Sequence, residues 1–173
     1  MLYFAIYKYR KVDYSKMAKK KKLSPGTICV NKKANFNYSI EDSIEAGVVL
    51  SGTEVKAIRE GKAQINESYA VFKGHELFLL NSNIAEFSHG NRNNHEPDRS
   101  RKLLLHKSEL RKLQQRKERE NISLIPLKLY WSKGNVKCAI GIGIGKKSVD
   151  KRQTIKDRDW KRDQHRILKN NNR

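Results

Sequence analysis

The chain has 173 residues, about the size of one domain, and its 38 Lys and Arg against 18 Asp and Glu give a net charge of +20. No apolar run approaches the ~20 residues that cross a bilayer, which excludes a protein with membrane-spanning helices. A positive charge of this size indicates an anionic partner, with nucleic acid as the first candidate and an anionic membrane surface as the second.

Residues 1–27 are predicted to be an N-terminal extension without fixed structure. The apolar start Met1–Tyr7 is too short for a signal-peptide core, and its charges follow the apolar run rather than precede it. Met17 opens the run MAKKKK, which is typical of a natural start. We therefore expect residues 1–16 to be a dispensable upstream extension.

The body of the protein, residues 28–145, is predicted to be mainly β. Short segments rich in β-branched and aromatic residues indicate strands, and two of the intervals between them have the composition of tight turns. These strands together with two or three helices predict an α+β fold: an antiparallel OB-fold-like barrel with helices packed outside it. The predicted strands are 28–31, 36–41, 47–50, 68–72, 76–80, 84–87, 124–131 and 135–144.

Two helices are predicted within the body. Ser51 followed by Glu54 has the spacing of a capping box, and Gly61 has the position of a C-terminal glycine cap. The segment 107–120 is helix-forming and strongly charged, with a narrow apolar stripe that includes Leu113.

Basic residues gather in three runs rather than spreading evenly. Residues 17–33 hold six lysines and no acid, and residues 146–173 carry a net charge of +7. One such run alone is more often a solvated surface, but three runs favour contact with phosphates. The third run, 99–119, contains Arg99, Arg101, Lys102, Lys107, Arg111, Lys112, Arg116, Lys117 and Arg119.

The basic tail, residues 146–173, has too few apolar residues to fold alone. We expect it to be disordered in the free protein and helical on a nucleic-acid partner. Its apolar residues are interpreted as lying loosely along one side of that helix; they include Ile155, Trp160, Ile167 and Leu168.

No catalytic, metal or cofactor site is predicted. Cys29 and Cys138 have no zinc-site spacing and cannot build a disulfide framework, so they indicate a reducing compartment and a cytoplasmic location. The glycines of 141–145 lack the spacing of a phosphate loop and indicate close packing against another backbone. The loop 88–98 holds His89, His95, Glu96 and Asp98, which could be imagined as a nuclease metal site but are interpreted as a polar loop.

Several blocks of sequence together resemble the SsrA-binding protein family, also called small protein B. The resemblance begins near Asn31 and runs to the end of the chain. The blocks, in order, are NKKANFNYSIED, EAGVVLSGTEVKAIREGK, SYAVF, NSNIAEFSHGN, RSRKLLLHKSEL, PLKLYW and GKKSVDKR.

The resemblance implies a bacterial RNA-binding protein that is not an enzyme. Such a protein binds the tRNA-like domain of transfer-messenger RNA (tmRNA, or SsrA RNA). It delivers the aminoacylated RNA, together with translation elongation factor Tu, to stalled ribosomes for trans-translation, in which nascent peptides are tagged for degradation. Its fold is an OB-type barrel with a C-terminal tail that occupies the empty mRNA channel near the decoding centre of the small-subunit rRNA.

The same resemblance implies two groups of functional residues. Asn31, Glu45, Leu104 and Lys137 match positions that bind the tRNA-like domain. In physical terms, Lys137 neutralises phosphate, Leu104 offers an apolar contact to an unstacked base, and Glu45 contacts a base edge or orders a loop. The tail residues that match ribosome-binding positions are Gly145, Lys146, Lys147, Asp150, Lys151, Arg152, Trp160, Ile167 and Leu168.

The chain departs from the family pattern at Val149, where an aromatic residue or His is common, and a valine has no ring for a stacking contact there. Three other functions stay open on the composition alone. The first is a general ribosomal or rRNA-binding protein, the second is a small nuclease, and the third is a membrane-surface protein.

Overall fold

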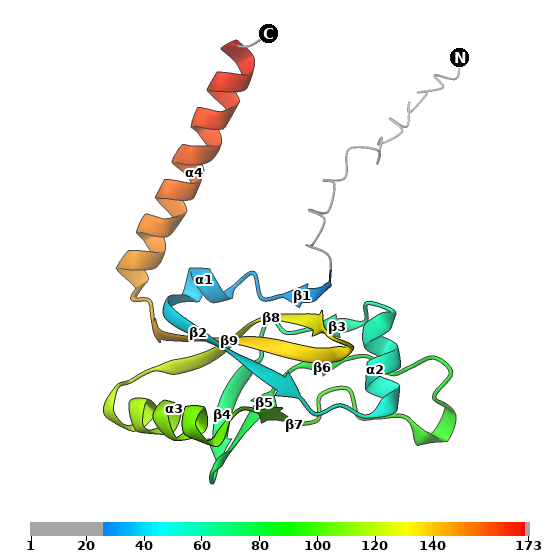
Figure 1. The fold of residues 1–173 in the computed structure, drawn as a ribbon. Helices are drawn as coiled ribbons and strands as arrows, with labels where there is room; N and C mark the ends of the chain where they lie inside the picture. The colour runs from blue at the N-terminus through cyan, green and yellow to red at the C-terminus, as the bar shows by residue number, and fades with distance from the viewer. Residues whose placement is uncertain (1–25, 172–173) are drawn as a thin grey trace, which may run out of the picture.

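The computed structural model describes residues 26–171; residues 1–25 and 172–173, and with them most of the predicted N-terminal extension, lie outside the described part (Figure 1). The elements, in order, are β1 (Thr27–Val30), α1 (Ala34–Asn37), β2 (Tyr38–Val48), α2 (Gly52–Arg59), β3 (Ala63–Gln64), β4 (Tyr69–Lys73), β5 (Glu76–Leu80), β6 (Asn83–Ile84), a 3-10 turn (Asn91–Asn93), β7 (Arg101–Leu104), α3 (Lys107–Arg119), β8 (Ser123–Ser132), β9 (Asn135–Gly145) and α4 (Ser148–Asn171).

Six strands form a closed antiparallel ring in the order β8–β4–β5–β7–β2–β9, because β9 pairs back onto β8. The ring is uneven: β4 and β8 are joined only through Ala70 and Leu124, whereas β2 and β9 pair along most of their length. β1 adds to the second half of β8. The predicted mainly β fold with an OB-like ring of antiparallel strands is therefore confirmed.

The long strands β2 and β9 pack closely because β9 carries glycines. A Cβ atom added to Gly143 would lie 2.2 Å from the carbonyl oxygen of Ser39, and one added to Gly141 would touch the side chains of Leu127 and Ile40. The prediction of close approach by a neighbouring backbone is confirmed at Gly143, where only glycine leaves room for β2, whereas Gly141 meets side chains and Gly145 meets nothing within 4 Å.

Local signals in the sequence predicted the turns and two helices correctly. Ser51 and Glu54 form a reciprocal capping box at the start of α2, and Gly61 follows the helix with φ +76°. The turn between β8 and β9 is Lys133 and Gly134, both with positive φ, as a two-residue hairpin turn requires.

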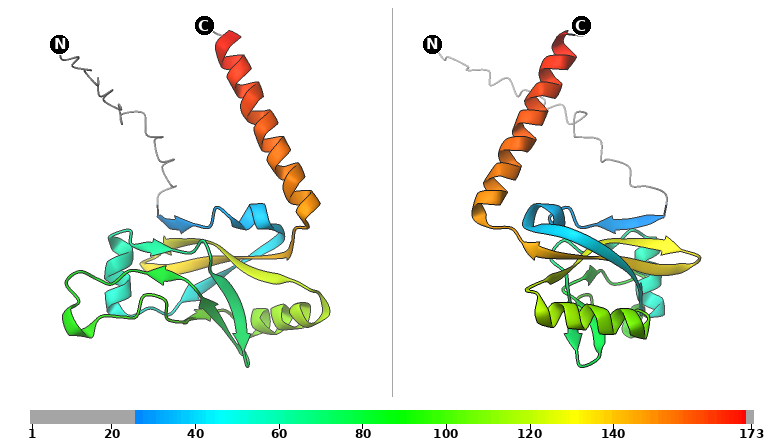
Figure 2. Two further views of the ribbon diagram at one scale, coloured as in Figure 1. Left: turned by 180° about the vertical axis from the view of Figure 1, so that it is seen from behind. Right: turned by 60° about the vertical axis from the view of Figure 1, so that its left-hand side comes forward.

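Apolar side chains from the ring and from α2 and α3 form one core, with each helix contributing a narrow stripe. Ile58 of α2 and Leu113 of α3 are buried, and both helices lie against the body in Figures 1 and 2. The most deeply buried apolar side chains include Ile65, Leu77, Leu79, Ile84, Leu103, Leu129 and Ile140.

Two strand predictions were partly wrong at the start of the body. Phe36 and Asn37, predicted in a strand, belong to α1, because the Asn31 carboxamide oxygen accepts from the backbone N–H groups of Lys33 and Ala34 and bends the chain. The predicted strands 36–41 and 47–50 are largely one strand, β2, whose acidic middle is held by its pairing with β9.

Two further boundaries differ from prediction, and two short strands were missed. Thr27 belongs to β1 and not to the N-terminal extension. The strand predicted at 84–87 ends at Ile84, because the Asn94 side chain both donates to and accepts from the backbone of Phe87 and starts a loop. The strands β3 and β7 had not been predicted.

The tail from Ser148 to Asn171 is one helix, α4, which begins beside α1 and projects from the body (Figures 1 and 2). The segment is thus able to form the helix that was expected on RNA, and the change from disorder in the free protein to a helix on RNA stays a prediction. The prediction that its apolar residues lie along a single side was wrong in one respect. At 100° per residue, Ile155 lies about 140° around the helix from Trp160. Val149, Trp160 and Ile167, spaced by 11 and 7 residues, share a stripe instead. Within the part of the chain that the structure describes, no helix is long and apolar enough to cross a membrane.

Candidate RNA interface

A row of residues in register crosses four strands on the outside of the ring. Leu104 of β7 lies opposite Gly47 of β2, Gly47 opposite Lys137 of β9, and Lys137 opposite Tyr130 of β8. Directly paired residues of antiparallel strands point to the same face of a sheet. Leu104 and Lys137, far apart in sequence, therefore lie on one face.

Glu45 lies on the same face, two residues before Gly47 on β2. Its carboxylate accepts from Lys137 Nζ at 3.1 Å. The neighbouring Tyr130 hydroxyl and Lys137 together lower the pKa of Glu45, so the carboxylate is ionised. Burial, followed by the nearby Glu45 charge, raises the pKa of Tyr130 to about 12. Lys128 adds a second exposed cation to this face. It lies opposite Ala139 of β9, and Ala139 lies opposite Glu45 of β2.

Leu104 is 52 % exposed on the outer face of β7, whereas Leu103 beside it is buried in the core. A Cβ on Gly47 would meet the Leu104 Cβ at 3.4 Å, an ordinary van der Waals contact, so Leu104 rests directly against the backbone of β2. The result is an apolar side chain held on rigid backbone beside the cation of Lys137. Such a pair can meet a base and its phosphate together.

Asn31, the fourth predicted RNA-binding residue, is placed differently. It is 6 % exposed and lies at the end of β1, several strands from Glu45. Its Nδ2 donates to Pro126 O at 3.1 Å, and its Oδ1 accepts from the backbone N–H groups of Lys33 and Ala34. The structure thus brings Glu45, Leu104 and Lys137 together and has Asn31 fixing the junction of β1, α1 and β8.

The residues predicted to bind the ribosome begin at the root of the tail. Gly145 pairs with Tyr38, and Lys146 donates to Asn37 O from its backbone and to Asn35 O from Nζ at 3.0 Å. The Asp150 carboxylate accepts from the backbone N–H of Lys147 at 3.3 Å, which satisfies a free donor at the start of α4.

Farther along α4 the predicted residues face solvent. Lys151 and Arg152 occupy its first turns, and the side chains of Trp160, Ile167 and Leu168 are each at least 60 % exposed. A helix with cations and unburied apolar side chains suits a partner that is both anionic and able to stack with Trp160.

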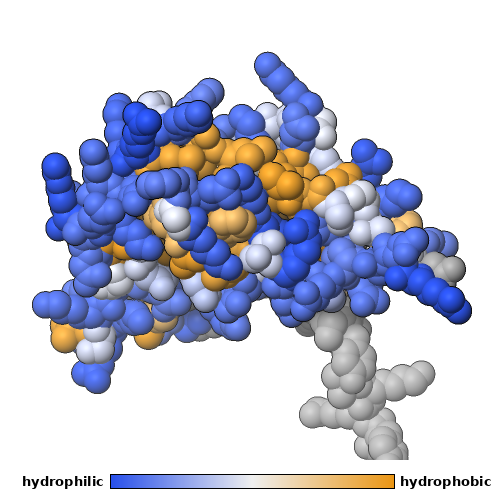
Figure 3. Space-filling model, turned by 90° about the horizontal axis from the view of Figure 1, so that it is seen from below, coloured by the Kyte–Doolittle hydropathy of each residue, from blue (hydrophilic) through white to orange (hydrophobic). Residues whose placement is uncertain are grey.

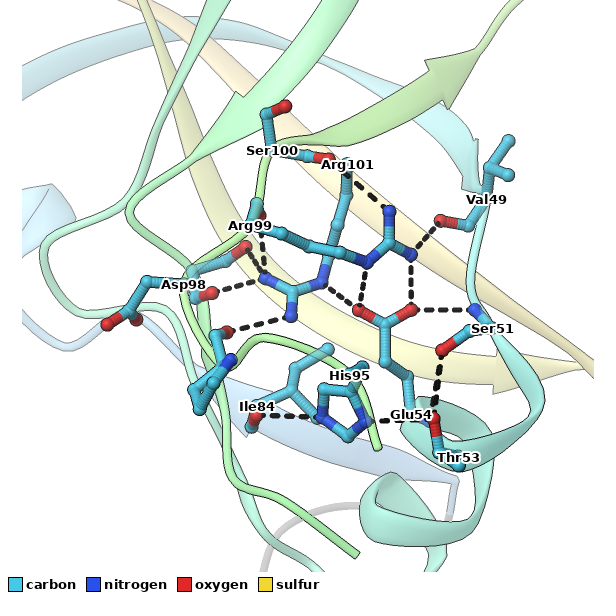
Figure 4. A network of polar contacts seen from close by, with 12 residues as sticks. Val49, Ser51, Thr53, Glu54, Ile84, His95, Asp98, Arg99, Ser100 and Arg101 are labelled. Atoms are coloured by element: carbon cyan, nitrogen blue, oxygen red, sulfur yellow. Dashed lines mark hydrogen bonds and ion pairs between the residues drawn. The ribbon is translucent and has the colours of Figure 1, made fainter. Parts of the chain in front are cut away.

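The sequence reasoning missed a buried polar network behind this surface (Figure 4). Glu54 of α2 accepts from Arg101 Nε and Arg99 Nε, each at 2.8 Å, and both Glu54 and Arg101 are fully buried. Arg101 also donates to Ser82 and to Pro97 O. Burial alone would raise the pKa of Glu54, but hydrogen bonds from Arg99 and Ser51 and the arginine charges lower it.

This network corrects the prediction that the whole run 99–119 is a phosphate-binding surface. Arg99 and Arg101 neutralise Glu54 inside the protein, and Lys102 and Arg116 pair with Glu76 and Glu41. The one available signal of this network was the alternation of Arg99, Ser100 and Arg101, in a block shared with the family. Such an alternation is compatible with a strand. Nothing in the local sequence indicated that its partner is Glu54.

The polar loop 88–98 is anchored to the body through His95. His95 is buried, with one ring nitrogen 3.0 Å from the Thr53 hydroxyl and the other 3.0 Å from Ile84 O. Among the described residues, no group of three or more His, Cys, Asp or Glu could hold a metal ion. Burial raises the pKa of Cys138 to about 12 and that of Cys29 to about 11, so neither thiol is a reactive thiolate near neutral pH.

Comparison with known proteins agrees with this arrangement. The sequence profile of the family described as SmpB protein matches residues 28–170. An SsrA-binding protein of Staphylococcus haemolyticus (strain JCSC1435) is 54 % identical over 153 residues, 88 % of this chain and 98 % of that protein. An SsrA-binding protein of Chelativorans sp. (strain BNC1) is 54 % identical over 144 residues, 83 % and 93 % of the two chains.

A solved structure is also similar, from work described as "tmRNA-SmpB: a journey to the center of the bacterial ribosome". The match has a TM-score of 0.58 and 43 % identity, and it covers 69 % of this chain and 85 % of that one. The profile match spans every strand of the ring. This chain is therefore a member of the SmpB family.

Proposed function

We propose that this chain binds the tRNA-like domain of SsrA RNA (tmRNA) and brings it to stalled ribosomes for trans-translation. The observation that carries the proposal is the in-register row on the outer face, where exposed Leu104 and Lys137 lie beside ionised Glu45 in a member of the SmpB family. Lys137 would neutralise a phosphate, and Leu104 would pack against an unstacked base.

Glu45 would give this face its selectivity. A carboxylate close to phosphates is unfavourable, so it lowers the affinity for RNA that offers only backbone. It can accept from a base N–H or a 2′-hydroxyl where the tRNA-like fold presents one, and it holds Lys137 in position meanwhile. Asn31 would support the face from the junction of β1 and α1 through its three hydrogen bonds.

The second part of the proposal concerns the tail. We infer that residues 28–145 form the RNA-binding body and residues 146–173 the ribosome-binding tail, with residues 1–27 as an extension. Helix α4 would enter the empty mRNA channel of the small subunit, with Lys146, Lys147, Lys151 and Arg152 facing rRNA phosphates near the decoding centre. Trp160 would stack on a base, while Ile167 and Leu168 would bury apolar surface in the channel.

The proposed role is binding in the cytoplasm and not catalysis. Aminoacylated tmRNA would reach the ribosome with this protein and translation elongation factor Tu on the same RNA. A general rRNA-binding protein would share the positive charge but would have no need of an acidic residue such as Glu45 among the cations of its RNA-binding face.

A filter-binding assay over several salt concentrations tests the proposal. The purified full chain is titrated with the isolated tRNA-like domain, an unrelated tRNA and a DNA duplex. We expect tight, salt-sensitive binding that strongly prefers the tRNA-like domain. Equal affinity for all three would contradict the proposal and support general binding to rRNA.

A further inference from the structure

A groove of about 530 Å³ lies between β7 and α3, next to the proposed RNA-binding face. Exposed Leu104 is part of both the groove and the RNA-binding face, so the groove continues that face from β7 toward α3. Figure 3 shows the side of the molecule on which α3 lies, where an apolar band is bordered by hydrophilic side chains. The groove is lined by Leu104, Leu105 and Leu110, with Lys102, Lys107 and Arg111 around them, and its lining also includes Glu76, the ion-pair partner of Lys102.

Two of the cations that line this groove, Lys107 and Arg111, differ from Arg116 of the same helix. Arg116 forms ion pairs with Glu41 and Glu120. Lys107 and Arg111 are exposed and, among the residues that the structure describes, neither forms an ion pair. The groove therefore presents two cations whose charge is not neutralised by the protein itself.

The positions of these two cations are also unfavourable for the helix. Lys107 is the first residue of α3, where the positive end of the helix dipole disfavours a cation. Arg111 is four residues on, so two like charges face each other across one helical turn. An anion bound between them would remove both unfavourable terms.

We propose that the β7–α3 groove is a second RNA-binding subsite, in which Lys107 and Arg111 hold phosphates while Leu104 and Leu110 contact an unstacked base. This inference rests on the proposed function and extends its RNA-binding face by one strand and one helix. RNA is favoured over an acidic peptide because the apolar floor lies directly beside the cations, which matches a base and its own phosphate. Continuity through Leu104 makes the same RNA molecule the occupant of both parts.

The test compares two double variants of the full chain with equal net charge. Lys107→Gln with Arg111→Gln removes the groove cations. Lys112→Gln with Arg119→Gln removes two exposed cations of the same helix that do not line the groove. Binding of the tRNA-like domain is measured for both and for the unchanged chain as a function of salt.

We expect the groove variant to bind at least tenfold more weakly than the control variant, with a salt slope lower by about 1.5, since each phosphate contact contributes about 0.7–0.9. Its melting temperature should be at or above that of the unchanged chain, because two unfavourable helix charges are gone, and this separates lost contact from lost fold. Equal affinities and slopes for the two variants would overturn the subsite while leaving the proposed function intact. Failure of the unchanged chain to prefer the tRNA-like domain would instead overturn the proposed function.

Discussion

The carboxylate of Glu54 and the guanidinium of Arg101 form an ion pair at 2.8 Å with both side chains completely buried. Glu54 lies in the block EAGVVLSGTEVKAIR and Arg101 in the block RSRKLLLHK, 47 residues later. The pair ties α2 to β7, the strand that carries Leu104. Two blocks of the family resemblance are thus halves of one internal structure.

Replacement of Glu54 by Gln should destabilise the fold strongly, because Arg101 would keep a buried charge with no carboxylate opposite. Breaking a buried ion pair from one side costs about 3–5 kcal/mol. Urea unfolding measures this loss. The matched control is Glu60→Gln, which removes the partly exposed pair with Lys62 at 2.7 Å and should cost less than about 1 kcal/mol. Similar midpoints for the two variants would contradict the structural role of the network.

The stability of the protein should also fall in acid through Glu54. Its pKa is lowered in the folded state, so its contribution is present above the unfolded value of about 4.3 and is lost as the pH falls through the folded value. We expect the difference in unfolding free energy between the unchanged chain and Glu54→Gln to be constant above about pH 5 and to shrink as the pH falls below the unfolded value of about 4.3. A difference that does not shrink in this acid range would show that the Glu54 charge does not matter.

Gly143→Ala and Gly145→Ala form a matched pair on the same strand. The added methyl group at 143 would lie 2.2 Å from Ser39 O and force β2 and β9 apart, at a cost of about 1–3 kcal/mol or more. The methyl group at 145 would meet nothing within 4 Å, so this change should be nearly neutral. Thermal unfolding of both variants measures the difference. Equal melting temperatures would contradict the close approach of β2 to β9.

On the RNA-binding face, Lys137→Met should lower the slope of binding against salt by about 0.7–0.9, the loss expected for one phosphate contact. Lys62→Met is the control and should leave the slope unchanged, because Lys62 lies beyond the C-terminal end of α2, where it pairs with Glu60, and not on the strands of this face. Glu45→Gln should raise the affinity of the protein for unrelated tRNA, because the removed charge repels phosphates. The selectivity of the variant for the tRNA-like domain should therefore fall. Filter binding with both RNAs measures these effects. Unchanged selectivity of Glu45→Gln would remove Glu45 from the proposed site.

The sequence was sufficient where structure depends on neighbouring residues. The capping box of Ser51 and Glu54, the hairpin turn at Lys133 and Gly134 and the helix around Leu113 all follow from local patterns. The resemblance, and not the composition, pointed to Glu45, Leu104 and Lys137. That they share a face follows only from the register of three strands.

What the sequence could not provide depends on partners far along the chain. Arginine is a residue type usually found at the surface, and only the contact of Arg101 with Glu54 explains why Arg101 is buried. Phe36 favours a strand by itself, but the Asn31 side chain starts a helix there. Long-range contacts of single polar groups have no periodicity, so a pattern of apolar residues cannot reveal them.

The central claim is that a rigid body holds tmRNA while a separate cationic helix engages the ribosome. A bacterial strain without its own family member is complemented with the full chain or with a chain that ends at Gly145, and tagging of peptides from a message without a stop codon is measured. We predict that the full chain restores tagging, while the shortened chain still binds the tRNA-like domain and restores none. Tagging restored equally by both chains, or by neither, would contradict this account.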